Sequence, residues 1–106
     1  MKNYSIWIEA EQWGEWDSRD CNSDVIVSFE GNTRWVATFF TYDNIKTLAE
    51  RHAANGDCLN GKYFWATDMI LVDKVTRKRI EEVVAPLLID DEFEKVFSSP
   101  SVESYS

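Results

Sequence analysis

DVIVSFEGNTRWVATFFTY, residues Asp24–Tyr42, is the stretch that decides the fold predicted for this chain. Apolar and other side chains alternate along its first half, and an apolar run resumes after Gly31 and Asn32. Tight hairpin turns favour these two residues because both tolerate positive φ. The stretch therefore predicts a hairpin with strands near 24–30 and 33–41. The second strand is apolar on both faces, as expected for a central strand.

The chain before the hairpin predicts another strand. Tyr4–Trp13 alternates, which is typical of a strand with one face in the core and one in water. The inward face would carry Tyr4, Ile6, Ile8 and Ala10, and the outward face Ser5, Trp7, Glu9, Glu11 and Trp13. Residues 14–23 contain turn formers and acids without an apolar period, so we expect a loop there.

A helix and a buried strand are predicted after the hairpin. Thr41 or Asp43 can cap the helix, and Gly56 is a typical stop. Residues 57–62 are rich in turn formers and predict a loop. Tyr63–Val72 predicts a buried strand, interrupted near its middle.

The last third predicts a second helix and a short apolar turn. Thr76 can cap the helix, and Pro86 inside its apolar pattern predicts a bend or break. Phe93–Phe97 supplies the last apolar turn, and the Ser-rich residues 98–106 are expected to be a disordered tail.

The elements thus follow the order βββαβα, which predicts an α+β fold. We expect one domain over residues 1–97, with an antiparallel-dominated sheet of about four strands and two main helices packed on one face. A chain of 106 residues is long enough to bury a core without disulfides.

The charge balance restricts the partners that we expect. Nineteen acids against 11 bases give a net charge of −8, which disfavours nucleic acid and anionic membranes and favours basic partners. Solubility alone is the other explanation of this charge. The sequence shows no signal-peptide pattern and no apolar run of the roughly 20 residues that span a bilayer. We therefore expect a cytoplasmic protein with Cys21 and Cys58 reduced.

No cluster of residues predicts catalysis or a cofactor. His52 is the only histidine, and a pairing with Cys58 would lack a group that orients the ring. The two cysteines do not match zinc spacing, and the motifs of phosphate-binding loops are absent. The acids of the first loop, Asp17, Asp20 and Asp24, lack the register of a calcium loop. We expect no enzyme, no cofactor and no metal.

One basic run interrupts the acidic chain near the start of the second helix. It consists of Lys74, Arg77, Lys78 and Arg79. A solvated face that pairs with Glu81 and Glu82 explains it better than nucleic-acid binding, because nucleic-acid binders are usually basic overall.

An N-terminal strip of three tryptophans among acids is the predicted partner-binding surface. Its candidate contact residues are Trp7, Glu9, Glu11, Trp13, Glu15, Trp16, Asp17 and Asp20, with Asp24 at its end. Tryptophan is enriched in binding hot spots, but a helix covering this face would make the same residues part of the core. A second acidic patch is predicted at Asp90, Asp91, Glu92 and Glu94.

The chain resembles bacterial immunity proteins of polymorphic or contact-dependent toxin systems. The resemblance rests on DVIVSFEGNTRWVATFFTYDNIKTL (24–48) and LNGKYFWATDMILVDKVTRKRIEEVV (59–84), about half of the chain, and it includes no motif of functional residues. It implies a non-enzymatic protein that binds a cognate toxin, often a basic nuclease, and blocks its active site or substrate path.

Two other functions remain open at the level of sequence. The acids would also suit a phage anti-defence protein that mimics nucleic acid. A small enzyme or ligand-binding domain would instead use an aromatic pocket formed by Trp35, Tyr63 and Trp65. The oligomeric state is open too, because the exposed edge of Tyr4–Trp13 could pair with a second copy or with a partner strand.

Overall fold

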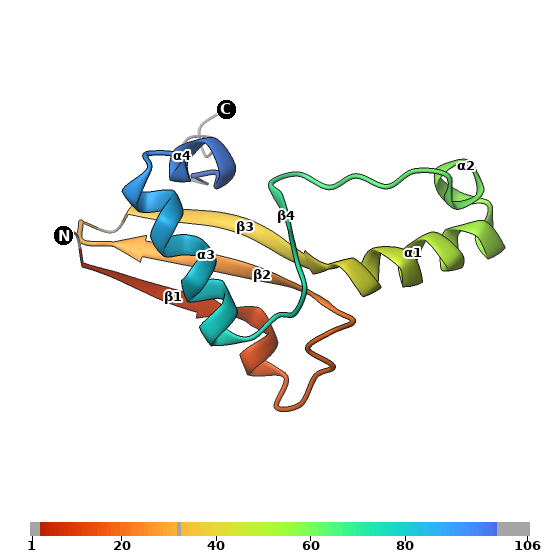
Figure 1. The fold of residues 1–106 in the computed structure, drawn as a ribbon, viewed down its shortest axis with the longest axis horizontal. Coiled ribbons are helices and arrows are strands. Elements are labelled where there is room, and N and C mark those ends of the chain that lie inside the picture. The colour runs from red at the N-terminus through yellow and green to blue at the C-terminus, as the bar shows by residue number, and fades with distance from the viewer. Residues whose placement is uncertain (1–2, 32, 100–106) are drawn as a thin grey trace.

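The structure is a computed structural model that describes residues 3–31 and 33–99. A four-stranded sheet runs through the molecule, and helices lie beside it and beyond its end (Figure 1). The elements are β1 (Tyr4–Ile8), the 3-10 helix η1 (Glu9–Gln12), β2 (Asn22–Phe29), β3 (Thr33–Thr41), α1 (Tyr42–Asn55), α2 (Asp57–Gly61), β4 (Met69–Val72), α3 (Arg77–Ile89) and α4 (Phe93–Val96).

The sheet is mixed, and its strands lie in the order in which they occur in the chain. β1 pairs with β2 and β2 with β3, both antiparallel, whereas β3 and β4 are parallel. The α+β class and the antiparallel-dominated sheet of four strands are therefore confirmed. The parallel pair arises because the chain from β3 travels out through α1 and back before it forms β4 (Figure 1).

The predicted hairpin is confirmed with small shifts at its ends. Phe29 pairs with Thr33, so β2 ends one residue earlier than predicted. Gly31 has φ of 89°, the left-handed conformation that glycine adopts without a steric cost.

The first strand is shorter than predicted. Alternation holds to Ile8, but Glu9–Gln12 form a 3-10 helix. The backbone N–H of Ala10 donates to Ser23 Oγ at 3.0 Å, and that of Trp13 to the carbonyl of Ala10 at 3.1 Å. The prediction of a strand beyond Ile8 is wrong because these bonds turn the chain out of the sheet.

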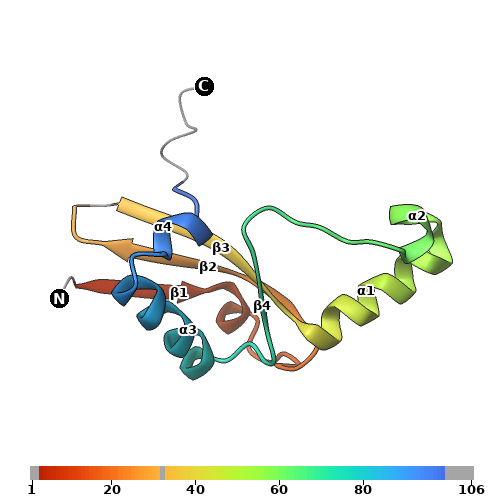
Figure 2. The same ribbon diagram turned by 45° about the horizontal axis from the view of Figure 1, so that its top comes forward.

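Helix α1 begins and ends where the sequence indicates. Thr41 Oγ1 accepts a hydrogen bond from the backbone N–H of Asn44 at 3.0 Å, so Thr41 is the cap. Gly56 ends the helix with φ of 84°. Both views show α1 leaving the end of β3 and extending beyond the sheet (Figures 1 and 2).

The segment after α1 differs most from the prediction. The predicted loop 57–62 contains α2, a turn with left-handed backbone at Cys58, Leu59 and Asn60. The predicted interruption of Tyr63–Val72 is confirmed, because Asp68 adopts φ of 53°. The prediction of a strand before Met69 is wrong, since β4 covers only Met69–Val72.

Helix α3 begins at the predicted cap and crosses one side of the sheet. Thr76 Oγ1 accepts from the backbone N–H of Arg79 at 3.2 Å. The helix continues through Pro86 to Ile89, so the predicted break does not occur. After α4, Ser98 pairs with Val36 of β3. Ser98 and the buried Ser99 were expected in the disordered tail, and the rest of that tail lies outside the described residues.

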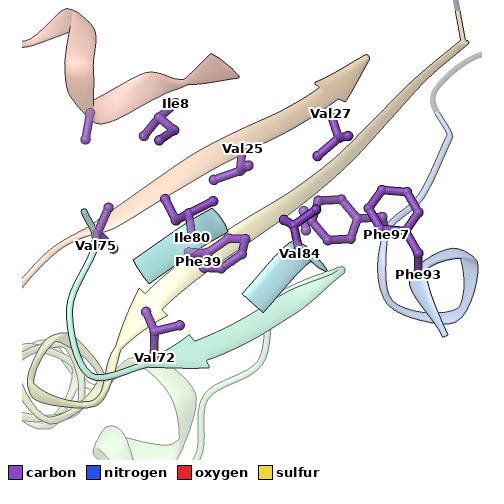
Figure 3. Close-up of a cluster of buried hydrophobic side chains, with 12 residues drawn as sticks. Ile8, Val25, Val27, Phe39, Val72, Val75, Ile80, Val84, Phe93 and Phe97 are labelled. Carbon is purple, nitrogen blue, oxygen red and sulfur yellow. The ribbon is translucent and has the colours of Figure 1, made fainter. Parts of the chain in front are cut away.

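The core lies between one face of the sheet and the helices α3 and α4. Its strand side chains include Ile8, Val25, Val27 and Phe39 (Figure 3). The helices contribute Ile80, Val84 and Phe93, and Phe97 joins the core just after α4. Burial of one such side chain stabilises the fold by about 1.5–3 kcal/mol. Within the described residues, no helix is long and apolar enough to cross a membrane.

Candidate functional site: an acidic and aromatic groove

A groove of about 940 Å³ opens where the sheet extends past the end of α3. Its walls come from β1, the β2–β3 hairpin, the end of α3 and the segment into α4. Four aromatic and three acidic residues are among those that line it: Tyr4, Phe29, Trp35, Phe93, Glu30, Asp91 and Glu94. We call this feature the acidic–aromatic groove.

The aromatic rings form a connected row. The Tyr4 and Phe29 centroids lie 5.9 Å apart, and Phe29 meets Phe93 edge-on at 5.6 Å. Phe93 also meets Trp35 at 5.8 Å and stacks on Phe97 at 4.4 Å. Such edge and offset contacts are the preferred aromatic geometries. The row therefore has a fixed arrangement.

The sheet's pleat explains why these rings share one face. Tyr4 is directly opposite Phe29, and Trp35 is opposite Val27. Successive side chains alternate between faces, so Phe29 and Val27 point to the same side. This is the core-facing side of the sheet. Helix α3 ends before it reaches the region of this face that carries Tyr4, Phe29 and Trp35. The inward face is therefore half-buried at this end.

The charges at the groove all have the same sign. Asp91 and Glu94 belong to the acidic turn, which we define as the exposed residues Asp90, Asp91, Glu92 and Glu94. Across residues 3–31 and 33–99, no ion pair involves the acidic turn, and no basic residue lines the groove. Glu30 accepts a hydrogen bond from Asn3 Nδ2 at 2.8 Å, which leaves its charge in place.

The N-terminal strip is divided by its structural contacts. Trp16 donates from Nε1 to the carbonyl of Val75 at 2.9 Å and packs against the core. Glu9 accepts from the backbone N–H of Asp24 at 3.1 Å. Glu11 accepts two hydrogen bonds from Arg77, at 2.8 and 2.9 Å, and this hydrogen bonding lowers the pKa of Glu11.

Asp20 is also bound within the fold. Its two oxygens accept from Asn44 Nδ2 at 3.0 Å and Thr47 Oγ1 at 2.8 Å, and these bonds lower its pKa. Asp20 thereby ties the first loop to α1.

The rest of the strip lies at the surface. Trp7 is 43% exposed and Trp13 is 46% exposed, and Glu15 and Asp17 are exposed as well. Asp17 accepts from the backbone N–H of Arg19 at 3.0 Å, which shapes the loop locally. Trp7 projects from the sheet face opposite the core. The strip stays a prediction as a binding surface, with these four residues as its accessible part.

The predicted aromatic pocket of Trp35, Tyr63 and Trp65 does not form. Trp35 lines the groove, but Tyr63 and Trp65 lie in the segment between α2 and β4, 50% and 69% exposed. Among the described residues, no group of three or more potential metal ligands comes together.

The single histidine and the cysteines lie away from the groove. The His52 ring stacks on Phe64 with centroids 6.0 Å apart, and within the described chain its buried Nδ1 has no hydrogen-bond partner. Burial raises the pKa of the Cys21 thiol to about 11, helped by the charges of Asp17 and Asp20. Cys21 is therefore a protonated thiol at neutral pH and a poor nucleophile.

The sequence predicted Asp91 and Glu94 of the groove as part of an acidic patch, but not Glu30, Tyr4, Phe29 or Phe93. Each of these three aromatic residues belongs to a periodic apolar pattern that predicts a core position. The pattern of an inward face is the same whether or not a helix covers it. A comparison of the strand and helix lengths is the only signal in the sequence that points to an uncovered end.

Comparisons with family models, curated proteins and solved structures found no match to this chain.

Proposed function

We propose that this protein is a non-enzymatic inhibitor that binds a basic partner protein, as an immunity protein binds its toxin. The acidic–aromatic groove, bordered by the acidic turn, is the observation that carries the proposal. Four exposed carboxylates that lack ion pairs within the described residues stand beside a fixed row of aromatic rings.

The two parts of this surface would act at different stages of binding. Carboxylates of one sign attract a basic partner over a distance of about 8 Å at physiological salt and raise the association rate. Aromatic side chains buried at contact slow dissociation. The ion-paired acids of the described residues lie elsewhere, because Arg77 and Arg79 bind acids of η1, of α3 and of the loop before α3.

The proposal includes a cytoplasmic location and no direct binding of nucleic acid. The net charge of −8 supports the second point, and the unpaired cysteines Cys21 and Cys58 are compatible with the first.

A charge-matched pair of variants tests the proposal. The first replaces three acids of the acidic turn, Asp90→Asn, Glu92→Gln and Glu94→Gln. The control replaces three exposed acids of α1 and α2, Asp43→Asn, Glu50→Gln and Asp57→Asn. Both variants have the same net charge, so any difference between them reports the position of the charge.

The partner is isolated from the source cell with the tagged wild-type chain, and its activity is titrated with the purified protein. We expect loss of the partner's activity at a one-to-one ratio. The association rate of the first variant should be about tenfold lower at low salt, with the difference shrinking as salt rises. A partner that stays active at saturation, or an equal rate for both variants, would contradict the proposal.

A further inference from the structure

The groove offers a cation an aromatic face and carboxylates, and no base among residues 3–31 and 33–99 lines it. We propose that the acidic–aromatic groove binds an arginine side chain, carried on a basic segment of the partner. The guanidinium would lie over the Trp35 ring and be held by a carboxylate of the rim. The source of the arginine rests on the proposed function, whereas the preference of the groove for a cation does not.

Trp35 is the residue best suited to hold the cation. Indole is the strongest of the aromatic partners in cation–π contacts, which require the cation within about 6 Å of the ring centroid. Trp35 is half-buried, and Phe93 supports it from the core with centroids 5.8 Å apart. Phe93 is itself 4% exposed and stacked on Phe97, so the position of Trp35 is established before a ligand arrives.

The charges favour a cation over a neutral ligand. Asp91, Glu94 and Glu30 line the groove. Among residues 3–31 and 33–99, Arg34 and Lys95 are the bases next to lining residues in the sequence, and neither lines the groove. Arg34 follows Thr33 and precedes Trp35 in β3, so the pleat points it to the other face of the sheet. Within the described part of the chain, no base therefore neutralises these carboxylates at the groove.

The size and shape of the groove favour arginine on a peptide segment. A volume of about 940 Å³ is in the upper range of sites for drug-sized ligands and exceeds the need of one side chain. A guanidinium is planar, stacks on aromatic faces and presents a fork of donors to a carboxylate. An ammonium group is a compact point charge without a flat face that could stack.

Two small probes test this inference without the partner. N-acetyl-arginine methylamide carries the guanidinium, and N-acetyl-citrulline methylamide has nearly the same shape without the charge. Each is titrated into the ¹⁵N-labelled protein while the indole N–H signals are followed by NMR. Trp35→Phe identifies the Trp35 signal, and Trp65→Phe identifies that of an exposed tryptophan in another part of the chain.

We expect the arginine probe to shift the Trp35 signal and to leave the Trp65 signal in place. Its affinity should exceed that of the citrulline probe roughly fivefold to thirtyfold, the ratio that a cation–π contact implies. Asp91→Asn and Glu94→Gln change exposed side chains, so the fold should persist, and each should weaken the arginine probe about twofold to fivefold.

The inference would be overturned if the two probes bound with equal affinity. It would also be overturned if the Trp35 indole signal did not shift at the highest accessible concentration of the arginine probe. The outcome is separable from that of the proposed function. If a partner is inhibited with the expected dependence on the acidic turn but Trp35 does not respond to arginine, only the groove inference fails. If Trp35 responds but no partner is inhibited, only the proposed function fails.

Discussion

Arg77 joins parts of the chain that are far apart in sequence. It forks onto Glu11 of η1, contacts Glu81 one turn further along α3, and donates from Nη2 to the carbonyl of Ile6 at 2.9 Å. That carbonyl lies on the free edge of β1, where an added strand would need it. Arg77 therefore closes part of the edge that the sequence left open to pairing.

The first prediction concerns this arginine. Because its side chain is 43% exposed, we expect Arg77→Ala to lower the free energy of unfolding by only about 1 kcal/mol. Lys78→Ala, an exposed neighbour, should change it by less than about 0.5 kcal/mol. Urea denaturation at pH 7 measures both values, and equal midpoints for the two variants would contradict a structural role for Arg77.

Contacts at this scale were predictable only where they are local. Sequence spacing predicted that the basic run pairs with Glu81 and Glu82, and Arg77–Glu81 and Arg79–Glu82 are both present. The contact between Arg77 and Glu11 spans 66 positions, and no local pattern indicates it. The same reason left Glu11 and Asp20 in the predicted binding strip, although both also serve as structural acceptors.

At the scale of elements, α1 and α2 form a unit that depends on one close approach. A Cβ atom at Gly61 would lie 2.2 Å from the carbonyl oxygen of Ala49 and 3.0 Å from the nitrogen of Ala53. Both are backbone atoms of α1 and cannot rotate away. The left-handed turn of α2 therefore packs directly onto the helix that precedes it.

The second prediction separates this contact from backbone strain. Gly61 has φ of 81° and Gly14 has φ of 86°, but a Cβ at Gly14 would meet no atom within 4 Å. Gly14→Ala should cost about 1–2 kcal/mol, the usual penalty for left-handed backbone. Gly61→Ala should cost several kcal/mol more, or release α2 from α1, because a backbone clash is added to the same strain.

Urea denaturation gives the two costs, and amide hydrogen exchange along α1 shows a local release. Similar destabilisation by both substitutions, with α1 protected in both, would show that the approach of Gly61 to Ala49 has no energetic role.

Element boundaries were predictable where a local hydrogen bond sets them. Thr41 and Thr76 cap their helices through their own side chains, and Gly56 ends α1 through its own backbone, so three boundaries followed from residue type. β1 ends at Ile8 because of Ser23, a residue 13 positions from Ala10. Such a contact is not visible in the pattern of either segment.

At the scale of the whole molecule, hydrogen bonds to the ionised carboxylates of Glu11, Asp20 and Asp73 stabilise the folded state. The pKa of Glu11 lies below its usual value because of the hydrogen bond from Arg77, and that of Asp73 because of the bond from Arg79. The hydrogen bonds from Asn44 and Thr47 have the same effect on Asp20. A lowered pKa in the folded state contributes stability that is complete above the unfolded value and is lost as the pH falls through the folded value.

The third prediction is therefore loss of stability in acid. The ordinary pKa values are 4.5 for Glu and 3.8 for Asp, so the urea midpoint should hold down to about pH 5 and fall progressively below it. A variant with Glu11→Gln, Asp20→Asn and Asp73→Asn should start from a lower midpoint and fall less steeply. An equally steep fall would show that other carboxyls control the acid transition.

The candidate groove was the least predictable feature at this scale. The α+β class and the inward face of the sheet followed from periodicity, and the acids Asp91 and Glu94 followed from composition. Their combination with Tyr4 and Trp35 depends on how far α3 extends along the sheet. The packing of the helix on the sheet sets that extent, and no local sequence pattern indicates it.

The bridge between Ser98 and Val36 has a mechanical consequence. Two backbone hydrogen bonds, of 2.7 and 3.0 Å, join Ser98 to the third strand of the sheet, and Phe97 is anchored in the core just before it. A protease or translocase that pulls on the chain from its C-terminal side would load these bonds and then extract two stacked rings, Phe97 and Phe93. The rate of such forced unfolding depends on the height of the unfolding barrier. The contacts of Phe93–Ser98 would therefore limit how fast the protein unfolds under tension.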